Sequence, residues 1–206
     1  MRKYCTVEDV ARYTGLPVAV LDRVGIVRMI ERASAEIERM TGFVFEATPA
    51  VEDMWAPAKY SFLRKQHVPL QVLTVRSSPI ISVNDLQIDG ESVDVSTLYW
   101  VGDRIYLTPD SPVQDFGVNT KIHVEYTHGI TDESIVKLVN QLCVVLTALE
   151  IADSPMGVNE LFKNSVFAEL SAGDVRPESF PQDITAQLVR EANRLFRLIP
   201  KRGEVW

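Results

Sequence analysis

The sequence predicts an α+β protein: a helical bundle formed by N- and C-terminal helices, with an inserted antiparallel β domain. Apolar residues recur at helical spacing before residue 42 and after residue 131, and they alternate with polar residues in between. Because one amphipathic stripe cannot be buried alone, we expect the helices at the two ends to pack on each other. The predicted parts are N-terminal bundle helices (1–42), the inserted β domain (43–130), C-terminal bundle helices (131–199) and an extended tail (200–206).

The first predicted element is a short helix that begins with a capping box formed by Thr6 and Asp9 and ends at Gly15. A longer helix is expected from about Asp22, and Gly42 supplies the left-handed residue that ends it. Its apolar residues step by four, three, four and three positions, which places them in one stripe. The stripe consists of Ile26, Ile30, Ala33, Ile37 and Met40.

Between residues 43 and 129 the pattern becomes that of antiparallel strands, and we expect five to seven of them. Asp89-Gly90 and Gly102-Asp103 each separate two strand-like runs, which is typical of tight hairpins. For residues 47–66 the pattern favours an excursion carrying Trp55 and Tyr60. Alternating strands are expected at Val68, Leu70 and Val72, and at Ile122, Val124 and Tyr126.

Helical spacing returns at Asp132, the expected N-cap of a helix that ends at Ser154-Pro155. Its apolar stripe is Ile135, Leu138, Leu142, Val145, Leu149 and Ala152, widened by Val139 and Leu146. A shorter amphipathic helix is expected from Asn159 to Leu170, and a last helix from about Pro181 to Leu198. The apolar positions of that last helix are Ile184, Leu188, Val189, Ala192, Leu195, Phe196 and Ile199.

Overall composition limits the class of protein. The 206 residues allow a sizeable core, because about 70% of the unfolded surface can be buried at this length. The net charge of −7 argues against a protein that coats nucleic acid, although a local basic patch is compatible with it. The N-terminal stretch lacks the apolar region of a signal peptide, and the uncharged apolar run from Leu138 to Leu149 is shorter than the ~20 residues of a membrane span. We therefore expect a soluble, intracellular protein with no membrane contact.

Residues that could carry chemistry are few. Cys5 and Cys143 lie far apart and show neither metal-ligand spacing nor a disulfide framework, so we expect two free thiols in a reducing compartment. His123 and His128 are five residues apart on a predicted strand, so they should lie on opposite faces and share no metal. Solvent-facing or loop positions are expected for these two and for His67.

Enzyme motifs are scarce in the sequence. It contains no G-x-S-x-G elbow, Walker loop, G-x-G-x-x-G, H-E-x-x-H or C-x-x-C motif. No two carboxylates are spaced so that acid–base catalysis can be argued. We therefore expect a protein that is not an enzyme, with no catalytic, cofactor-binding or metal-binding residues and no cofactor. The alternative is a small hydrolase or ligand-binding domain with a pocket between bundle and strands.

One charged surface stands out on the last predicted helix. Its cations step by four, three and four positions and so share a face: Arg190, Arg194, Arg197 and Lys201, with Arg202 beside them. One interpretation is a solvated face, because cations near a helix C-terminus suit the helix dipole. The other is a basic strip for an acidic partner or for passing DNA. Val205-Trp206 gives the polar tail an apolar end, which is either disordered or an interface anchor.

Two motifs suggest a family. The run A-x-x-x-I-E-x-x-T-G-x-x-F spans Ala33 to Phe45, and V-x-Y-x-x-G spans Val124 to Gly129, just before an acidic helix start. In this order they resemble the head–tail connector (adaptor) proteins of tailed bacteriophages, the first run matching their second helix. The resemblance covers Val24 to about Ile151. This chain has a larger strand block, and Asp132 stands where a proline often begins the following helix.

The resemblance implies a virion structural protein that catalyses no reaction. Such connectors form a ring, usually of twelve copies, under the portal of the DNA-filled capsid, extend the DNA channel and offer a platform for the stopper or tail. The implied partners are therefore further copies of the chain, the portal protein and a stopper or tail protein, while DNA passes without specific binding. The implied location is the virion neck, after assembly in the host cytoplasm.

The resemblance also implies a docking segment, because the C-terminal segment of connectors typically docks against the portal. The residues expected to contact the portal are Arg190, Arg194, Arg197, Lys201, Arg202 and Trp206. Another tail-completion or neck protein with the same bundle-plus-insert design is the alternative within the virion.

Overall fold

The protein is α+β, as the sequence predicts, with 45% of its residues in helices and 26% in antiparallel sheets. Its residues divide into two compact units, here called the helical unit (residues 1–42 and 132–205) and the β unit (residues 43–131). The computed structural model describes residues 2–23, 25–56, 59–61, 66–68, 72–109, 111, 113, 115–116, 119–154 and 180–201.

Helix α1 (Val7–Thr14) begins and ends as predicted. The Thr6 side chain accepts a hydrogen bond from the Asp9 amide, and the Asp9 carboxylate accepts one from the Thr6 amide, which completes the capping box. At the other end Gly15 is left-handed (φ 70°), and its amide donates to the Ala11 carbonyl. A residue with a side chain would be strained at Gly15, so the glycine fixes where the helix stops.

The single long helix expected from Asp22 is in fact two helices, α2 (Val18–Arg23) and α3 (Ile26–Thr41). The prediction was wrong because Gly25 is left-handed (φ 74°), which interrupts the helical path. The C-terminal prediction is confirmed, since Gly42 is also left-handed and its amide donates to the Glu38 carbonyl. The predicted stripe is buried except at Met40, which is half-buried.

Helix α4 (Glu133–Asp153) begins at the predicted N-cap, where the Asp132 carboxylate accepts hydrogen bonds from the Ser134 and Ile135 amides. Its burial differs from the predicted stripe. Ile135, Leu138, Leu146, Leu149 and Ala152 are only half-buried, whereas the buried residues are Val139, Leu142, Cys143, Val144, Val145, Thr147, Ala148 and Ile151. The physical reason is that α4 has neighbours on several sides, so burial follows the contacts rather than one face.

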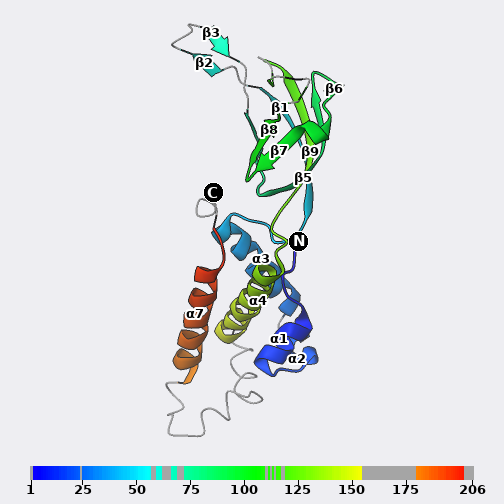
Figure 1. The fold of residues 1–206 in the computed structure, drawn as a ribbon. Coiled ribbons are helices and arrows are strands. Elements are labelled where there is room, and N and C mark those ends of the chain that lie inside the picture. The colour runs from blue at the N-terminus through cyan, green and yellow to red at the C-terminus, as the bar shows by residue number, and fades with distance from the viewer. Residues whose placement is uncertain are drawn as a thin grey trace. The chain divides into compact units, whose positions relative to one another are not determined.

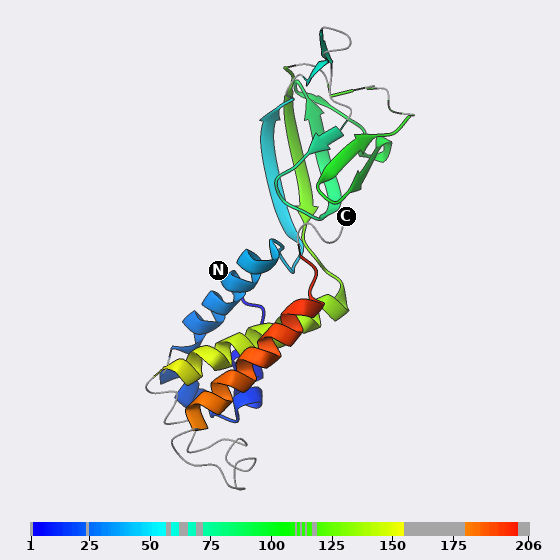
Figure 2. The ribbon, with the colours of Figure 1, turned by 90° about the vertical axis from the view of Figure 1, so that its left-hand side faces the viewer.

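The helical unit is built around α4, as Figures 1 and 2 show. Helices α1 and α3 from the N-terminal part and α7 (Phe180–Leu198) from the C-terminal part all contact it. Segments far apart in the sequence therefore share one apolar interior. By length and composition alone α4 could also cross a membrane, because the whole helix is longer than its uncharged run. A central bundle helix passes the same test, and here other helices cover α4. The helix expected at 159–170 lies outside the described residues.

The β unit has nine strands among its described residues, more than the five to seven expected. The strands are β1 (Thr48–Trp55), β2 (Lys59–Ser61), β3 (Gln66–Val68), β4 (Val72–Thr74), β5 (Ile80–Ile88), β6 (Glu91–Ser92), β7 (Leu98–Val101), β8 (Arg104–Leu107) and β9 (Lys121–His128). They form antiparallel sheets ordered β1-β9-β5-β6, β4-β8-β7 and β2-β3. Several strands have only two or three residues, too few to show a period in sequence.

Two further strand predictions need correction. The excursion expected over residues 47–66 is wrong at its start, because β1 pairs with β9 along its whole length, from Thr48 opposite His128 to Trp55 opposite Lys121. The strand expected over residues 68–72 is divided between β3 and β4, and residues 69–71 lie outside the described part. The alternation at Val68, Leu70 and Val72 starts at the end of β3 and ends at the start of β4, so in the sequence it looks like one strand.

Both predicted hairpins are confirmed. Asp89 and Gly90 have positive φ (51° and 86°) and join β5 to β6, as a two-residue turn of type I′ requires. Gly102, with φ 64°, lies in the turn between β7 and β8. Strand β9 alternates as predicted, with Ile122, Val124 and Tyr126 fully buried. These three residues belong to the core of the β unit with Leu73, Leu86, Ile105 and Phe116.

Candidate docking surface

The basic strip predicted on the last helix forms a continuous surface on α7. Leu188, Ala192, Leu195 and Ile199 are buried and fix which side of α7 faces the bundle. Arg190, Arg194 and Arg197 fall between them in the helical period and are exposed. We call Arg190, Arg194 and Arg197 the basic face. These three cations point to solvent because the opposite side of α7 carries the buried apolar residues.

The basic face is poorly neutralised by its surroundings. Between Ala186 and Lys201 the only acidic residue in the sequence is Glu191, and its carboxylate accepts a hydrogen bond from the Tyr13 hydroxyl (2.7 Å). Arg190, Arg194 and Arg197 form no ion pair with any residue that the structure describes. Arg197 stands in the last turn of α7, where a cation suits the helix dipole. The face is therefore a concentration of positive charge on a chain of net charge −7.

The other residues predicted for this surface are placed differently from the three arginines. Lys201 is half-buried, and its Nζ lies 4.6 Å from the centre of the Phe196 ring in a cation–π contact. Arg202 and Trp206 lie outside the described residues. Two apolar residues of α7 are exposed, Val189 (39%), which was expected to be buried, and Leu198 (58%). The face therefore offers apolar contacts as well as charge, a mixture suited to a protein partner.

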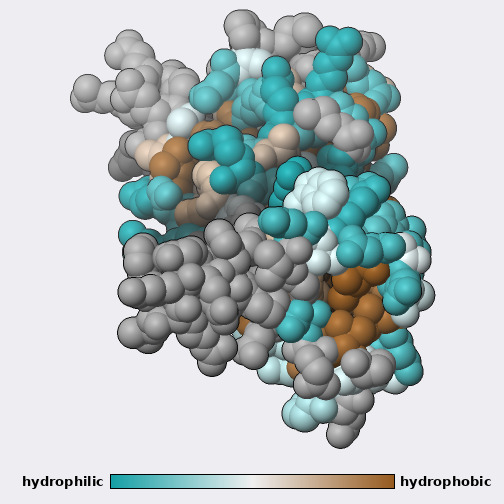
Figure 3. All heavy atoms as spheres, turned by 90° about the horizontal axis from the view of Figure 1, so that it is seen from above, coloured by the Kyte–Doolittle hydropathy of each residue, from teal (hydrophilic) through white to brown (hydrophobic). Residues whose placement is uncertain are grey.

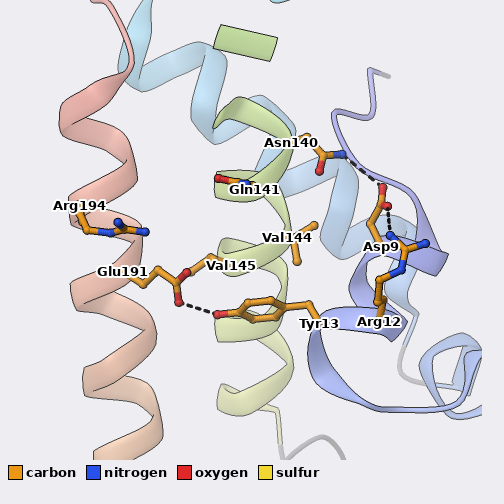
Figure 4. Close-up of a pocket in the computed structure, with 9 residues that line it drawn as sticks. All are labelled: Asp9, Arg12, Tyr13, Asn140, Gln141, Val144, Val145, Glu191 and Arg194. Atoms are coloured by element: carbon orange, nitrogen blue, oxygen red, sulfur yellow. Dashed lines mark hydrogen bonds and ion pairs between the residues drawn. The ribbon is translucent and has the colours of Figure 1, made fainter. Parts of the chain in front are cut away.

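A groove of about 460 Å³ adjoins the basic face within the helical unit (Figure 4). Arg194 belongs to both the groove and the basic face. The groove is lined by Asp9, Arg12 and Tyr13 of α1, by Asn140, Gln141, Val144 and Val145 of α4, and by Glu191 and Arg194 of α7. No sequence pattern indicated it, because its walls come from three segments that are well separated in the sequence.

Most polar side chains in the groove hold helices together. Asn140 donates to the Asp9 carboxylate (3.3 Å), which also lies 3.6 Å from Arg12. The pKa of Asp9 is lowered, first by the hydrogen bond from the Thr6 amide and then by that of Asn140. The pKa of Tyr13 is raised by burial and by its bond to Glu191. Because these groups are engaged with one another, the groove is better described as a joint between α1, α4 and α7 than as a reactive centre.

A second cavity, of about 400 Å³, lies in the β unit and contains His123. The His123 ring places Nδ1 3.0 Å from an Asp53 oxygen and Nε2 3.5 Å from a Glu125 oxygen. Its pKa is raised, chiefly by the hydrogen bond to Asp53. Among the described residues no group of three His, Cys, Asp or Glu side chains is placed to hold a metal ion.

The histidine predictions are only partly right. His123 and His128 do lie on opposite faces of β9, as alternation predicts. The expectation of solvent-facing histidines is wrong for His128, which is buried and has its ring 5.9 Å from the ring of Tyr126. His128 lies on the same face of β9 as Ile122, Val124 and Tyr126, and this face is buried to the last residue of the strand. The side chain of His67 lies outside the described part of β3.

Exposed hydrophobic residues form a further surface feature that the sequence did not indicate. Figure 3 shows hydrophobic side chains reaching one face of the molecule among hydrophilic ones. In the β unit the exposed ones include Val51 and Trp55 on β1, Ile81 on β5, and Tyr99 and Val101 on β7. Trp55 is 67% exposed, and the Tyr99 ring stacks on that of Tyr106 at 4.7 Å. Alternation alone does not identify them, since it says which residues share a face but not which face is covered.

A scan of the chain against models of known protein families found no match, and a search among curated proteins found no relative.

Proposed function

We propose that the chain is a head–tail connector (adaptor) of a tailed bacteriophage, a virion protein that assembles into a ring between the portal and the stopper or tail. The observation that carries the proposal is the architecture itself, a bundle formed from both chain ends with an antiparallel β insertion. The two motifs of the resemblance lie at the two passages of the chain between the units. Gly42 ends α3 before the first passage, and Gly129 follows β9 before the second.

The motif residues also have defined structural roles, which supports the resemblance beyond letter matching. Val124 and Tyr126 are fully buried in the β unit. Gly129 has φ 123°, and a Cβ placed there would lie 2.1 Å from the Glu46 carbonyl oxygen. Only glycine fits such a position, so the last residue of V-x-Y-x-x-G is required by the fold of the chain as it leaves β9.

The basic face supports the same proposal as a docking surface for the portal. Unpaired arginines next to exposed Val189 and Leu198 favour a partner that is acidic and partly apolar. A ring needs two different complementary surfaces on each subunit, and the helical and β units offer surfaces of different chemistry. The overall charge of −7 also suits a conduit, because firm contacts with DNA phosphates would oppose ejection.

The proposal is tested by mixing the purified chain with the portal protein of the same virus and weighing the products by native mass spectrometry. We expect rings of about twelve subunits bound to the portal, visible as such by electron microscopy. A chain that stays monomeric in the presence of the portal contradicts the proposal. A defined complex of another copy number, or binding only to a tail protein, would instead favour a different neck or tail-completion role.

The docking surface has a separate test in the triple variant Arg190→Gln, Arg194→Gln and Arg197→Gln. We expect portal affinity to fall by about 10-fold to 100-fold, with a weaker dependence on salt, because exposed ion pairs contribute up to about 1 kcal/mol each. The matched control removes three exposed cations elsewhere, with Arg28→Gln, Arg104→Gln and Lys137→Gln. Equal losses in the two triple variants would mean that net charge matters and the basic face does not.

A further inference from the structure

The two cysteines, 138 positions apart in sequence, meet inside the helical unit. The Cys5 Sγ and Cys143 Sγ atoms are 3.1 Å apart, both residues are buried, and both thiols are free. Cys5 lies just before α1, and Cys143 lies in the middle of α4. A disulfide bond is about 2.05 Å long, so a further approach of about 1 Å would join the two sulfurs.

The surroundings of the pair favour one thiol as the nucleophile. The Cys5 thiol donates a hydrogen bond to Cys143 Sγ, and the Ser34 hydroxyl oxygen lies 3.5 Å from the same sulfur. The pKa of Cys143 is lowered, first by the hydrogen bond from Cys5, against the effect of burial. The pKa of Cys5 is raised by the same shared hydrogen bond and by burial. Of the two thiols, Cys143 is therefore the one that loses its proton more readily.

The segment that carries Cys5 is held in place by hydrogen bonds to α3 and α4. The Tyr4 amide donates to the Ser34 hydroxyl (3.0 Å), and the Asn140 side chain donates to the Tyr4 carbonyl (3.0 Å). These bonds join residues before α1 to α3 and to α4 without any covalent link. Residues 2–6 lie outside any helix, so we expect this segment to open to solvent more readily than the helices do.

We propose that Cys5 and Cys143 are a redox-active dithiol, a modification site at which a small disulfide oxidant such as oxidised glutathione closes an intramolecular disulfide. The Cys143 thiolate attacks one sulfur of the oxidant, forms a mixed disulfide and releases one glutathione thiol. Cys5 then loses its proton, and its sulfur attacks Cys143 Sγ, which forms the Cys5–Cys143 bond and expels the second glutathione thiol. The protein loses two electrons and two protons, and the oxidant disulfide gains them as two thiols.

The closed disulfide would fasten the N-terminal segment to the central helix of the bundle. It would close a loop of 138 residues and so remove much of the conformational freedom of the unfolded chain. Because the sulfurs already lie close together, closing the bond requires little movement in the folded protein. The oxidised protein should thus be the more stable form, and the inference does not depend on the proposed function.

The test compares the full chain after treatment with oxidised glutathione and after treatment with dithiothreitol. We expect the oxidised sample to lose the mass of two hydrogens, to yield a crosslinked peptide containing Cys5 and Cys143, and to melt at a temperature higher by roughly 5 °C or more. The single variants Cys5→Ser and Cys143→Ser should form no internal crosslink. Cys5→Ser should instead retain a glutathione adduct on Cys143, because the second thiol that would expel it is absent.

Three results would overturn the inference. Two thiols that both remain open to alkylation after unfolding of the oxidant-treated protein would show that the pair does not close. Crosslinks between chains rather than within one chain would show that the thiols act separately. A lower melting temperature for the internally crosslinked protein would show that the bond does not fit the fold. All three are measured on the natural chain, so a folding defect in either variant does not weaken the test.

Discussion

Buried polar groups are satisfied differently in the two units. In the helical unit the buried hydroxyls of Thr14, Ser34, Thr41 and Thr147 each donate to the carbonyl four residues earlier in the same helix. In the β unit the Tyr126 hydroxyl donates to the Glu52 carboxylate of the neighbouring strand. The amides of Arg76 and Ser77 complete this network, with bonds to Glu52 (2.9 Å) and to Tyr126 (3.1 Å).

The difference indicates what holds each unit together. A hydroxyl that donates to its own helix joins no distant segments through that bond, so these four bonds add little to helix–helix contact, although the Ser34 hydroxyl also accepts a hydrogen bond from the Tyr4 amide. The helical unit therefore depends mainly on apolar packing around α4, with part-buried polar contacts such as Tyr13–Glu191 and Asp9–Asn140 between its helices. In the β unit the network around Tyr126 and Glu52 instead joins different segments directly, although one Glu52 oxygen is buried with no hydrogen-bond partner among the described residues.

The largest expected effect comes from opening the apolar interior of the helical unit. Leu142 is fully buried on α4, so Leu142→Ala should lower the free energy of unfolding of this unit by about 2–5 kcal/mol. The matched control is Leu138→Ala, the same change one turn away at a half-buried residue, which should cost clearly less. Hydrogen exchange read by mass spectrometry reports the two units separately. Equal costs for the two variants would contradict the burial pattern of α4.

A backbone position in the β unit should give the next largest effect. Gly129→Ala would place a Cβ 2.1 Å from the Glu46 carbonyl oxygen at φ 123°, so we expect a loss of about 3 kcal/mol from strain and displacement. Gly90→Ala is the control, because Gly90 also has positive φ (86°) but no atom lies within 4 Å of its added Cβ.

The control should cost only the backbone strain, about 1–2 kcal/mol. Chemical denaturation monitored by circular dichroism compares the two variants. If Gly129→Ala were no worse than Gly90→Ala, the close approach at Glu46 would not constrain the fold.

The polar network of the β unit predicts a smaller loss. Tyr126→Phe removes the donor to Glu52 and leaves that carboxylate less well satisfied, at a cost of about 1–3 kcal/mol. The comparison is Thr147→Val in the helical unit, because Thr147 is as fully buried as Tyr126. The Thr147 hydroxyl donates to the Cys143 carbonyl of the same helix, so its loss should change the free energy of unfolding by less than about 1 kcal/mol. Both are measured by denaturation under reducing conditions. A larger cost for Thr147→Val would reverse the comparison between the units.

The local elements were predictable wherever one residue type fixes the backbone. The capping box at Thr6, the glycines at 15 and 42, the N-cap Asp132 and both hairpin turns were all visible in the sequence and are confirmed. Each acts over two to five residues, so no distant information is needed. Gly25 had the same local significance, but the helical period on both sides concealed it.

Features that need contact between distant segments were not predictable. The apolar spacing of α4 predicted that the segment is a helix, but it did not predict which of its residues are buried. Contacts with three other helices, α1, α3 and α7, determine which residues are covered. The alignment of Arg190, Arg194 and Arg197 was visible from their spacing, whereas the adjoining groove, with Asp9 and Tyr13, was not. The meeting of Cys5 and Cys143 is of the same kind, since a separation of 138 positions gives no signal.

The smallest expected effect is a pH dependence confined to the β unit. The folded-state pKa of His123 is raised, chiefly by its hydrogen bond to Asp53, and the pKa of Asp53 is lowered, chiefly by the same bond. A histidine whose pKa is higher in the folded protein stabilises the fold fully at pH values below its unfolded-state pKa of about 6.5. This stabilisation is lost as the pH rises through the folded-state pKa. The contribution of Asp53 is lost only in acid, as pH falls through its lowered folded pKa.

Between about pH 6 and about pH 8 the β unit should therefore become slightly less stable, and His123→Gln should remove most of that slope. Asp53 is exposed and His123 is partly exposed, so salt should screen the effect. The measurement is the melting temperature of the natural chain and of His123→Gln across this range at low and high ionic strength. Asp53→Asn serves as the partner control and should flatten the same slope, since it removes the first acceptor of the imidazolium. An unchanged slope in both variants would locate the pH dependence elsewhere and leave the Asp53–His123 pair without a role in stability.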